Sequence, residues 1–266
     1  MPAFMINLAP VSAKRAKPLP PAVVRATVGI NPKTSRPRVE VMGHVVDRLT
    51  GREVLGWIQY AARGRRKALI GTHNLQSFYL AERNPDVARL YQMADVVQVD
   101  SLPLLKFAKM TGKDLGPDHL SAYAYWRDSF WAMCQRFGLR VYYLGGEVGM
   151  ASGAVRMVEM AYKDVRFAGR DRYFDETYEG EENQQVVSGI RRFAPDILLV
   201  NLGSPRQEAW IAENYNDLPP CVVMPISAAF DYELGDKTAG KSESASLFQI
   251  GCLLKPAMRD MFKRPQ

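Results

Sequence analysis

The sequence has few cysteines, few histidines and no long apolar run. Its 266 residues include three cysteines, at positions 134, 221 and 252, and three histidines, at positions 44, 73 and 119. The cysteines form no CxxC pair and no cluster with histidine, which argues against a disulfide framework or a zinc site and fits a reducing cytoplasm. No run of roughly 18 apolar residues is present, so we expect no transmembrane helix and only peripheral membrane contact.

Acidic residues are missing from the first 38 positions, which hold seven cations and seven of the 17 prolines. This composition predicts a disordered basic tail over residues 1–38. The net charge of +7 therefore belongs to the tail, because the remaining 28 cations face 28 acidic residues. A basic tail on a neutral body favours an anionic surface such as a bilayer over a nucleic-acid groove, and a solvated tail without a partner is the alternative. A signal peptide is not expected, because the cations follow the first apolar residues instead of preceding them.

From residue 39 the pattern alternates between short apolar strands and amphipathic helices. It predicts an α/β domain over residues 39–235, with a Rossmann-like, mostly parallel sheet and helices on both faces. An early strand or hairpin is expected from residue 39. The expected strands cover residues 67–72, 96–99, 141–144, 165–169, 197–202 and 221–226, and the expected helices cover 53–63, 75–83, 85–93, 103–111, 122–137, 149–162, 181–193 and 206–214. We expect residues 236–266 to be an atypical or truncated C-terminal appendage, in which residues 247–254 can form a short helix.

Small, polar and acidic residues follow several of the expected strands. Ligands of a parallel sheet bind beyond the carboxyl ends of its strands, so these residues are the candidates for a substrate site. They are Thr72 and Asn74, Asp100, Gly145 and Gly146, Asp171 and Tyr173, and Gly203, Pro205, Arg206, Gln207 and Glu208.

Asp100 ends the apolar strand expected at 96–99. A carboxylate at the rim of a partly apolar cleft can act as a general base that removes a proton from an attacking hydroxyl. The alternative is that Asp100 caps the helix expected from residue 103. Thr72 and Asn74 offer a hydroxyl and an amide for a sugar or phosphate oxygen, whereas His73 between them is expected to be structural.

Two glycine-containing turns follow other strands. Gly145 and Gly146 would let the backbone approach a diphosphate at the start of the next helix, although a plain tight turn also explains them. The segment Gly203-Ser-Pro-Arg-Gln-Glu-Ala-Trp opens another helix with a cation, an amide and a carboxylate. The amide suits a nucleobase edge and the helix start suits phosphate; the alternative is a capped helix with solvated charges.

Taken in order, these segments resemble the WecB/TagA/CpsF glycosyltransferases (glycosyltransferase family 26). The likeness extends from about residue 41 to residue 235, and Gly203-Ser-Pro-Arg-Gln-Glu looks like the G-x-P-x-Q-E signature of the family. Supporting segments lie at 72–75, 94–100, 141–146, 169–174, 196–214 and 228–235.

The resemblance implies an inverting transfer from a UDP-sugar, without a metal or other cofactor, to a saccharide on a polyprenyl diphosphate. Such transfers build wall teichoic acid, enterobacterial common antigen or exopolysaccharide at the inner face of the plasma membrane. Asp100 then matches the proposed catalytic aspartate, Thr72 and Asn74 match pocket residues, and Gln207 matches a conserved glutamine. Which sugar, acceptor and linkage are used is left open, and a homo-oligomer is compatible with the sequence.

The sequence departs from the family pattern in four places. Ser101 stands where glycine is usual, residues 119–124 lack an arginine and an acid, Arg172 replaces a glycine, and the chain diverges after residue 235. An alternative is therefore a catalytically impaired homologue that binds nucleotide-sugar or joins a complex. A nicotinamide-dependent dehydrogenase is a third reading on fold alone, and the loose glycine pattern argues against it.

Overall fold

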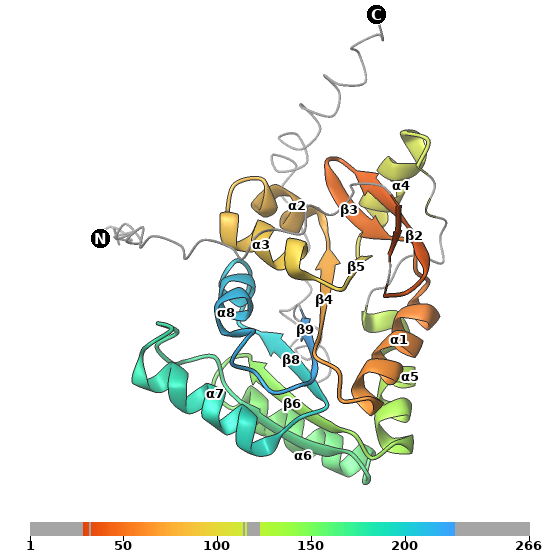
Figure 1. The fold of residues 1–266 in the computed structure, drawn as a ribbon. Helices are drawn as coiled ribbons and strands as arrows, with labels where there is room; N and C mark the ends of the chain where they lie inside the picture. The colour runs from red at the N-terminus through yellow and green to blue at the C-terminus, as the bar shows by residue number, and fades with distance from the viewer. Residues whose placement is uncertain (1–28, 32, 114, 116–122, 227–266) are drawn as a thin grey trace, which may run out of the picture.

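A parallel sheet of six strands forms the centre of the molecule (Figure 1). The computed structural model describes residues 29–31, 33–113, 115 and 123–226. The strands are β4 (Ala68–His73), β5 (Val96–Val99), β6 (Arg140–Gly145), β7 (Arg166–Arg170), β8 (Ile197–Asn201) and β9 (Val222–Pro225). All five residues of β8 are buried, as expected for a central parallel strand covered on both faces. The predicted α/β architecture is confirmed.

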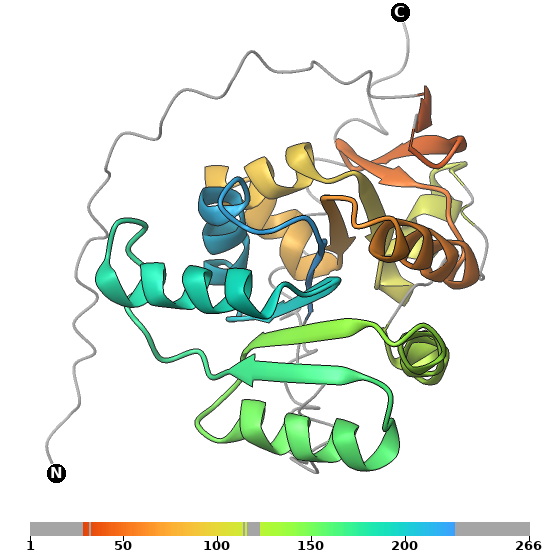
Figure 2. The same cartoon turned by 60° about the horizontal axis from the view of Figure 1, so that its bottom comes forward.

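Eight helices are found in the part of the chain that the structure describes. They are α1 (Gly51–Arg63), α2 (Leu75–Ala81), α3 (Pro85–Met93), α4 (Leu102–Met110), α5 (Tyr123–Arg136), α6 (Met150–Ala161), α7 (Glu181–Phe193) and α8 (Arg206–Asn214). Helices α1, α5 and α6 contribute to one apolar core, and the other five contribute to a second core on the opposite face. Figure 2 shows α6 and α7 on opposite sides of strands β6 and β7. None of the described helices is long and apolar enough to cross a membrane.

A small antiparallel sheet precedes the parallel one and corrects the predicted start of the folded region. It contains β1 (Gly29–Asn31), β2 (Arg36–Val41) and β3 (His44–Asp47). Arg38, expected in the basic tail, is buried, and its Nε donates to Asp47 Oδ1 at 3.0 Å. The other Asp47 oxygen accepts from the Val97 N–H of β5 at 2.8 Å. A buried ion pair and strand pairing therefore order residues 29–38, apart from position 32, which is not described.

The order of the strands indicates where a ligand is expected to bind. The parallel sheet runs β5-β4-β9-β8-β6-β7, which differs from the usual order of a dinucleotide-binding domain. The chain leaves β6 toward β7 and leaves the adjacent β8 in the opposite direction, toward β9. Helices α6 and α8 consequently lie on opposite faces. In open α/β sheets ligands bind where neighbouring strands diverge in this way, which is here the carboxyl ends of β6 and β8.

Several expected features lie outside the described residues. These are the tail up to residue 28, most of the divergent segment 119–124, the continuation of the chain beyond β9 and the C-terminal appendage 236–266.

Candidate active site

Gly145 and Gly146 lie at the point where β6 and β8 diverge. Gly145 has φ +135°, and a Cβ atom there would lie 2.0 Å from the carbonyl oxygen of Asn201 at the end of β8. The N–H of Gly146, with φ +75°, donates to that same oxygen at 3.0 Å. The two glycines are therefore needed for the close contact of two strand ends. Whether their backbone also approaches a diphosphate stays a prediction.

The start of α6 is occupied by a side chain of the protein. The Asp171 carboxylate, which follows β7, accepts from the N–H groups of Gly149 and Ala151 at 2.8 and 2.9 Å. A carboxylate at a helix N-terminus is stabilised by the free N–H groups and the helix dipole. These amides were expected to face phosphate, so Asp171 takes the place assigned to the substrate at this helix.

Tyr173 lies on the loop after β7 and is bound to the loop after β6. Its hydroxyl donates to the Glu147 carboxylate, which also pairs with Arg172. The Tyr173 side chain remains 58% exposed. Arg172, which stands where the family has glycine, thus connects the loops on one side of the crevice.

Gly203, Pro205 and Arg206 form the turn between β8 and α8. Gly203 has φ +81°, and its carbonyl accepts from the Gln207 N–H at 2.9 Å, which closes the turn. Arg206 was expected to offer a cation to the substrate. Instead its Nη2 and Nε donate to the two carboxylate oxygens of Glu176 at 2.5 and 3.2 Å. The Arg206 charge is therefore neutralised by the loop that follows β7.

Gln207 and Glu208, which were expected at the rim of the cleft, are both buried. They are 7% and 3% exposed, and Gln207 Nε2 donates to Glu208 Oε1 at 3.2 Å. Among the described residues, Gln207 Oε1 has no hydrogen-bond partner, whereas the Ser204 hydroxyl lies beside the Glu208 carboxylate. Burial raises the pKa of the Glu208 carboxyl. Unpaired buried acceptors are uncommon in folded proteins and indicate a place where a ligand donor can bind.

Thr72 and Asn74 lie at the end of β4 and are both held by neighbours. Thr72 Oγ1 accepts from Gln98 Nε2 of β5 at 2.8 Å. Asn74 caps α2, because its Oδ1 accepts from the Ser77 N–H at 2.8 Å. The Asn74 amide oxygen therefore has a structural role that the sequence analysis did not assign.

Asp100 continues β5 beyond its last residue, and its N–H donates to the His73 carbonyl at 2.7 Å. Ser101, not Asp100, caps α4, because the Ser101 hydroxyl accepts from the Leu104 N–H at 3.4 Å. The capping explanation for Asp100 is therefore wrong. Asp100 is half-buried at the carboxyl edge of the sheet.

Tyr91 joins the end of β4 to α8, and the sequence analysis missed it. Its hydroxyl donates to the Thr72 carbonyl at 2.8 Å, and its ring stacks on His73 at 3.6 Å between centroids. Burial raises the pKa of Tyr91, and the nearby Glu208 raises it further. His73 is buried and its Nδ1 lies 2.9 Å from Ser77 Oγ, as expected for a structural histidine. Gln98 was also missed, although a glutamine in the strand Val96–Val99 was a visible signal.

The predicted site residues form two groups at one edge of the sheet. One group surrounds the ends of β4 and β5 with Asp100, and the other surrounds β6 and β8 with Gln207 and Glu208. Strand β9 lies between them. Strands β5 and β8 are separated by three inter-strand spacings, a distance of about 14 Å. A ligand with two ends could contact both groups.

Comparison with known proteins gives a consistent match. Residues 39–240 match the model of the glycosyl transferase WecG/TagA/CpsF family. Two similar relatives are the N-acetylglucosaminyldiphosphoundecaprenol N-acetyl-beta-D-mannosaminyltransferases of Staphylococcus aureus strains NCTC 8325 / PS 47 and MRSA252. Each is 29% identical over 98 residues, which is 37% of this chain and 37% of the relative. The aligned part thus spans little more than a third of those relatives.

Proposed function

The chain belongs to the glycosyl transferase WecG/TagA/CpsF family, and we propose that it transfers a sugar from a UDP-sugar to a saccharide carried on a polyprenyl diphosphate. One observation carries the proposal. Gln207 Oε1 is a buried acceptor without a partner among the described residues, in the helix that follows β8 at the point where β6 and β8 diverge. A uracil N–H and a ribose or sugar hydroxyl are donors of the kind that this oxygen lacks.

The diphosphate of the donor is placed at the start of α8. The corresponding amides of α6 are bound to Asp171, whereas Pro205 at the start of α8 has no side-chain acceptor to cap it. The partial positive charge at the start of α8 favours phosphate oxygens, although the Gln207 N–H there already donates to the Gly203 carbonyl. The donor then extends over β9 toward β4, where Thr72 and Asn74 contact its sugar.

Asp100 is the general base of the proposed reaction. Its carboxylate accepts the proton of the acceptor hydroxyl while that oxygen bonds to the anomeric carbon of the donor. The bond from this carbon to the diphosphate breaks on the opposite side, UDP leaves with the electron pair, and the configuration inverts. A positioned general base of this kind typically contributes 10²–10⁴-fold in rate.

The relatives indicate which substrates to test first. The name of the Staphylococcus relatives describes transfer of N-acetylmannosamine to N-acetylglucosaminyldiphosphoundecaprenol. We propose that this chain uses a related lipid-linked acceptor, at the cytoplasmic face of the membrane.

The test is a transfer assay on the full chain with a panel of UDP-sugars and a short-chain prenyl-diphosphate N-acetylglucosamine acceptor. We expect Asp100→Asn to lower kcat at least about a hundredfold, with unchanged Tm and UDP affinity. Asp128→Asn, the same change at an exposed helix position, should leave kcat within about twofold. Near-normal turnover in Asp100→Asn would refute Asp100 as the base. UDP-sugar binding by the wild-type chain without transfer to any acceptor would instead support the impaired homologue.

A further inference from the structure

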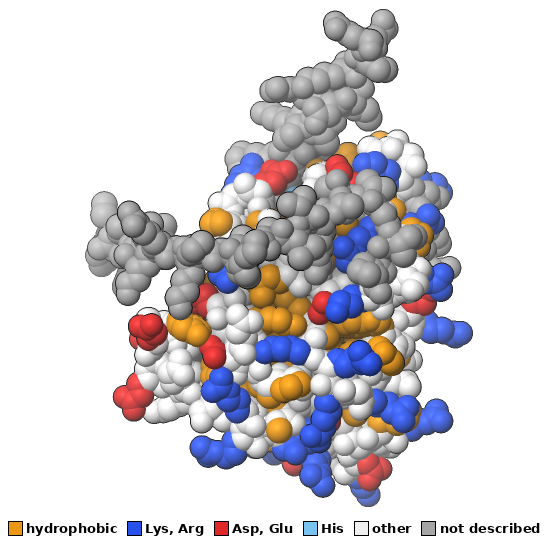
Figure 3. Space-filling view, viewed as in Figure 1, with side chains coloured by type: hydrophobic (Ala, Val, Ile, Leu, Met, Phe, Trp, Pro, Cys, Tyr) orange, Lys and Arg blue, Asp and Glu red, His pale blue; other side chains and the backbone are white. Residues whose placement is uncertain are grey.

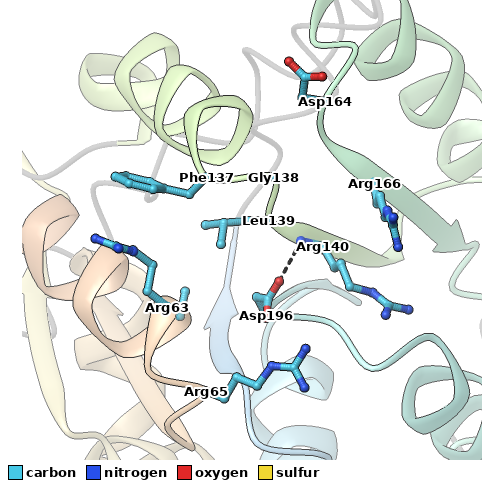
Figure 4. A pocket seen from close by; sticks show the side chains of 10 residues that line it. Arg63, Arg65, Phe137, Gly138, Leu139, Arg140, Asp164, Arg166 and Asp196 are labelled. Carbon is cyan, nitrogen blue, oxygen red and sulfur yellow. Dashed lines mark hydrogen bonds between the residues drawn. The ribbon is translucent and has the colours of Figure 1, made fainter.

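A depression of about 610 Å³ lies at the amino edge of the parallel sheet, away from the site residues at the carboxyl edge. Its charged lining consists of Arg63, Arg65, Arg140, Arg166, Asp164 and Asp196. Arg140 and Arg166 open strands β6 and β7, and Arg63 ends α1. In Figure 4 the guanidinium groups of Arg65, Arg140 and Arg166 lie on one side of the depression, and Arg63 lies on the other. We call these six residues the amino-edge basin.

The positive charge of the basin is not neutralised by ion pairs. Within the described residues, none of its four arginines has a carboxylate within salt-bridge distance. Asp196 instead accepts from the Arg140 backbone N–H at 2.9 Å. Arg140 Nε is buried and has no hydrogen-bond partner there, while Arg63 lies 4.4 Å from the ring centroid of Phe137. Lys and Arg also predominate over Asp and Glu in the lower half of the face seen in Figure 3.

Helix dipoles explain only part of this arrangement. A cation at the end of α1 is stabilised by the partial negative charge of the helix C-terminus, which accounts for Arg63. Arg140 and Arg166 stand in strands, and that argument does not apply to them. Four guanidinium groups with two carboxylates leave an excess of two positive charges around one open hollow.

We propose that the amino-edge basin binds a soluble, phosphate-bearing anion at a site separate from the active site. Guanidinium groups match phosphate oxygens with paired hydrogen bonds, and several of them around one hollow suit a ligand with at least two phosphate groups. A bilayer is the less suitable occupant. Strands of up to six residues separate the two edges by about 20 Å, so docking the basin on a membrane would turn the active site away from a lipid-linked acceptor.

The test is calorimetric titration of the full chain with pyrophosphate. Arg65→Ala/Arg166→Ala removes two exposed basin arginines, and Arg52→Ala/Arg156→Ala removes two exposed arginines elsewhere. We expect the basin variant to lose pyrophosphate affinity at one site at least tenfold, while the control variant keeps it. Donor KM and kcat should be the same in both variants, because none of the four arginines belongs to the candidate active site.

Three results would overturn the proposal. The first is that no saturable pyrophosphate binding depends on Arg65 and Arg166. The second is an equal loss of pyrophosphate affinity in both double variants, which would indicate a general charge effect. The third is binding to vesicles containing an anionic phospholipid, lost only in the basin variant, with no response to pyrophosphate. That result would assign the basin to a membrane surface. A failed transfer assay leaves this test unaffected, because the pyrophosphate titration uses neither donor nor acceptor.

Discussion

The two edges of the parallel sheet hold polar residues in opposite ways. At the carboxyl edge most polar side chains are bound to the protein itself: Asp171 caps α6, Asn74 caps α2, and Arg206 pairs with Glu176. Within the described residues, the buried polar atoms without a partner at this edge include Gln207 Oε1, Gln98 Oε1 and Ser204 Oγ. At the amino edge the basin arginines have no ion-pair partner within the described residues, and Arg63, Arg65 and Arg166 are exposed. The carboxyl edge is thus built to hold a few defined contacts in place, whereas the amino edge offers charge with little fixed geometry.

The largest difference between the edges is expected from glycine substitution. Gly145→Ala should destabilise the fold by about 4 kcal/mol or prevent folding, because its Cβ would overlap the Asn201 carbonyl and its φ is +135°. Gly138→Ala at the amino edge should cost only about 1 kcal/mol, since its φ is +57° and its nearest neighbour is 4.0 Å away. Urea unfolding of both variants measures the difference. Equal losses would show that the strand ends at the crevice are not rigid.

Gln207→Leu tests whether the unpaired amide serves the donor. We expect the donor KM to rise about tenfold, equivalent to about 1.4 kcal/mol, with little change in kcat. Gln185→Leu, on the exposed face of α7, is the matched control and should leave KM unchanged. An unchanged KM in Gln207→Leu would remove this residue from the donor site and leave the burial of its amide without a functional reason.

Glu208 should make stability depend on pH. Because burial raises its pKa, the folded state favours the protonated carboxyl, and that stabilisation is complete below the ordinary glutamate pKa of 4.5. It is lost as the pH rises through the raised value. Glu208→Gln should therefore match the wild type near pH 4 and become more stable by about 1 kcal/mol at pH 8, measured by chemical unfolding. A difference between the two proteins that stays constant with pH would contradict the assignment.

The smallest expected effect is that of metal removal. We propose that the transfer proceeds without a metal, so turnover after dialysis against EDTA should stay within about twofold of the untreated protein. Recovery of a lost activity by added Mg²⁺ or Mn²⁺ would show instead that the donor diphosphate is bound through a cation.

The sequence predicted the parallel sheet well, because the sheet follows from local pattern. Apolar runs such as Ile197–Asn201 mark buried strands, and the residues after parallel strands share one edge. Contacts between distant segments were not predictable in this way. The pairing of Arg38 with Asp47 ordered a segment that its composition assigned to a tail, and Glu176 neutralises Arg206 from 30 residues away. Tyr91 carried no signal at all, because aromatic residues are ordinary on the apolar side of a helix.

The contact between Asp47 and β5 also limits how copies of this chain can associate. Strand β5 is an outer strand of the parallel sheet, and an outer strand normally exposes N–H groups that a strand of another molecule can pair with. Asp47 binds the outward Val97 N–H, and Arg38 Nη2 donates to the Asp95 carbonyl at 3.4 Å. A second copy therefore cannot continue the sheet at β5 without displacing a buried ion pair. Any homo-oligomer should associate through side chains, or along the opposite outer strand β7.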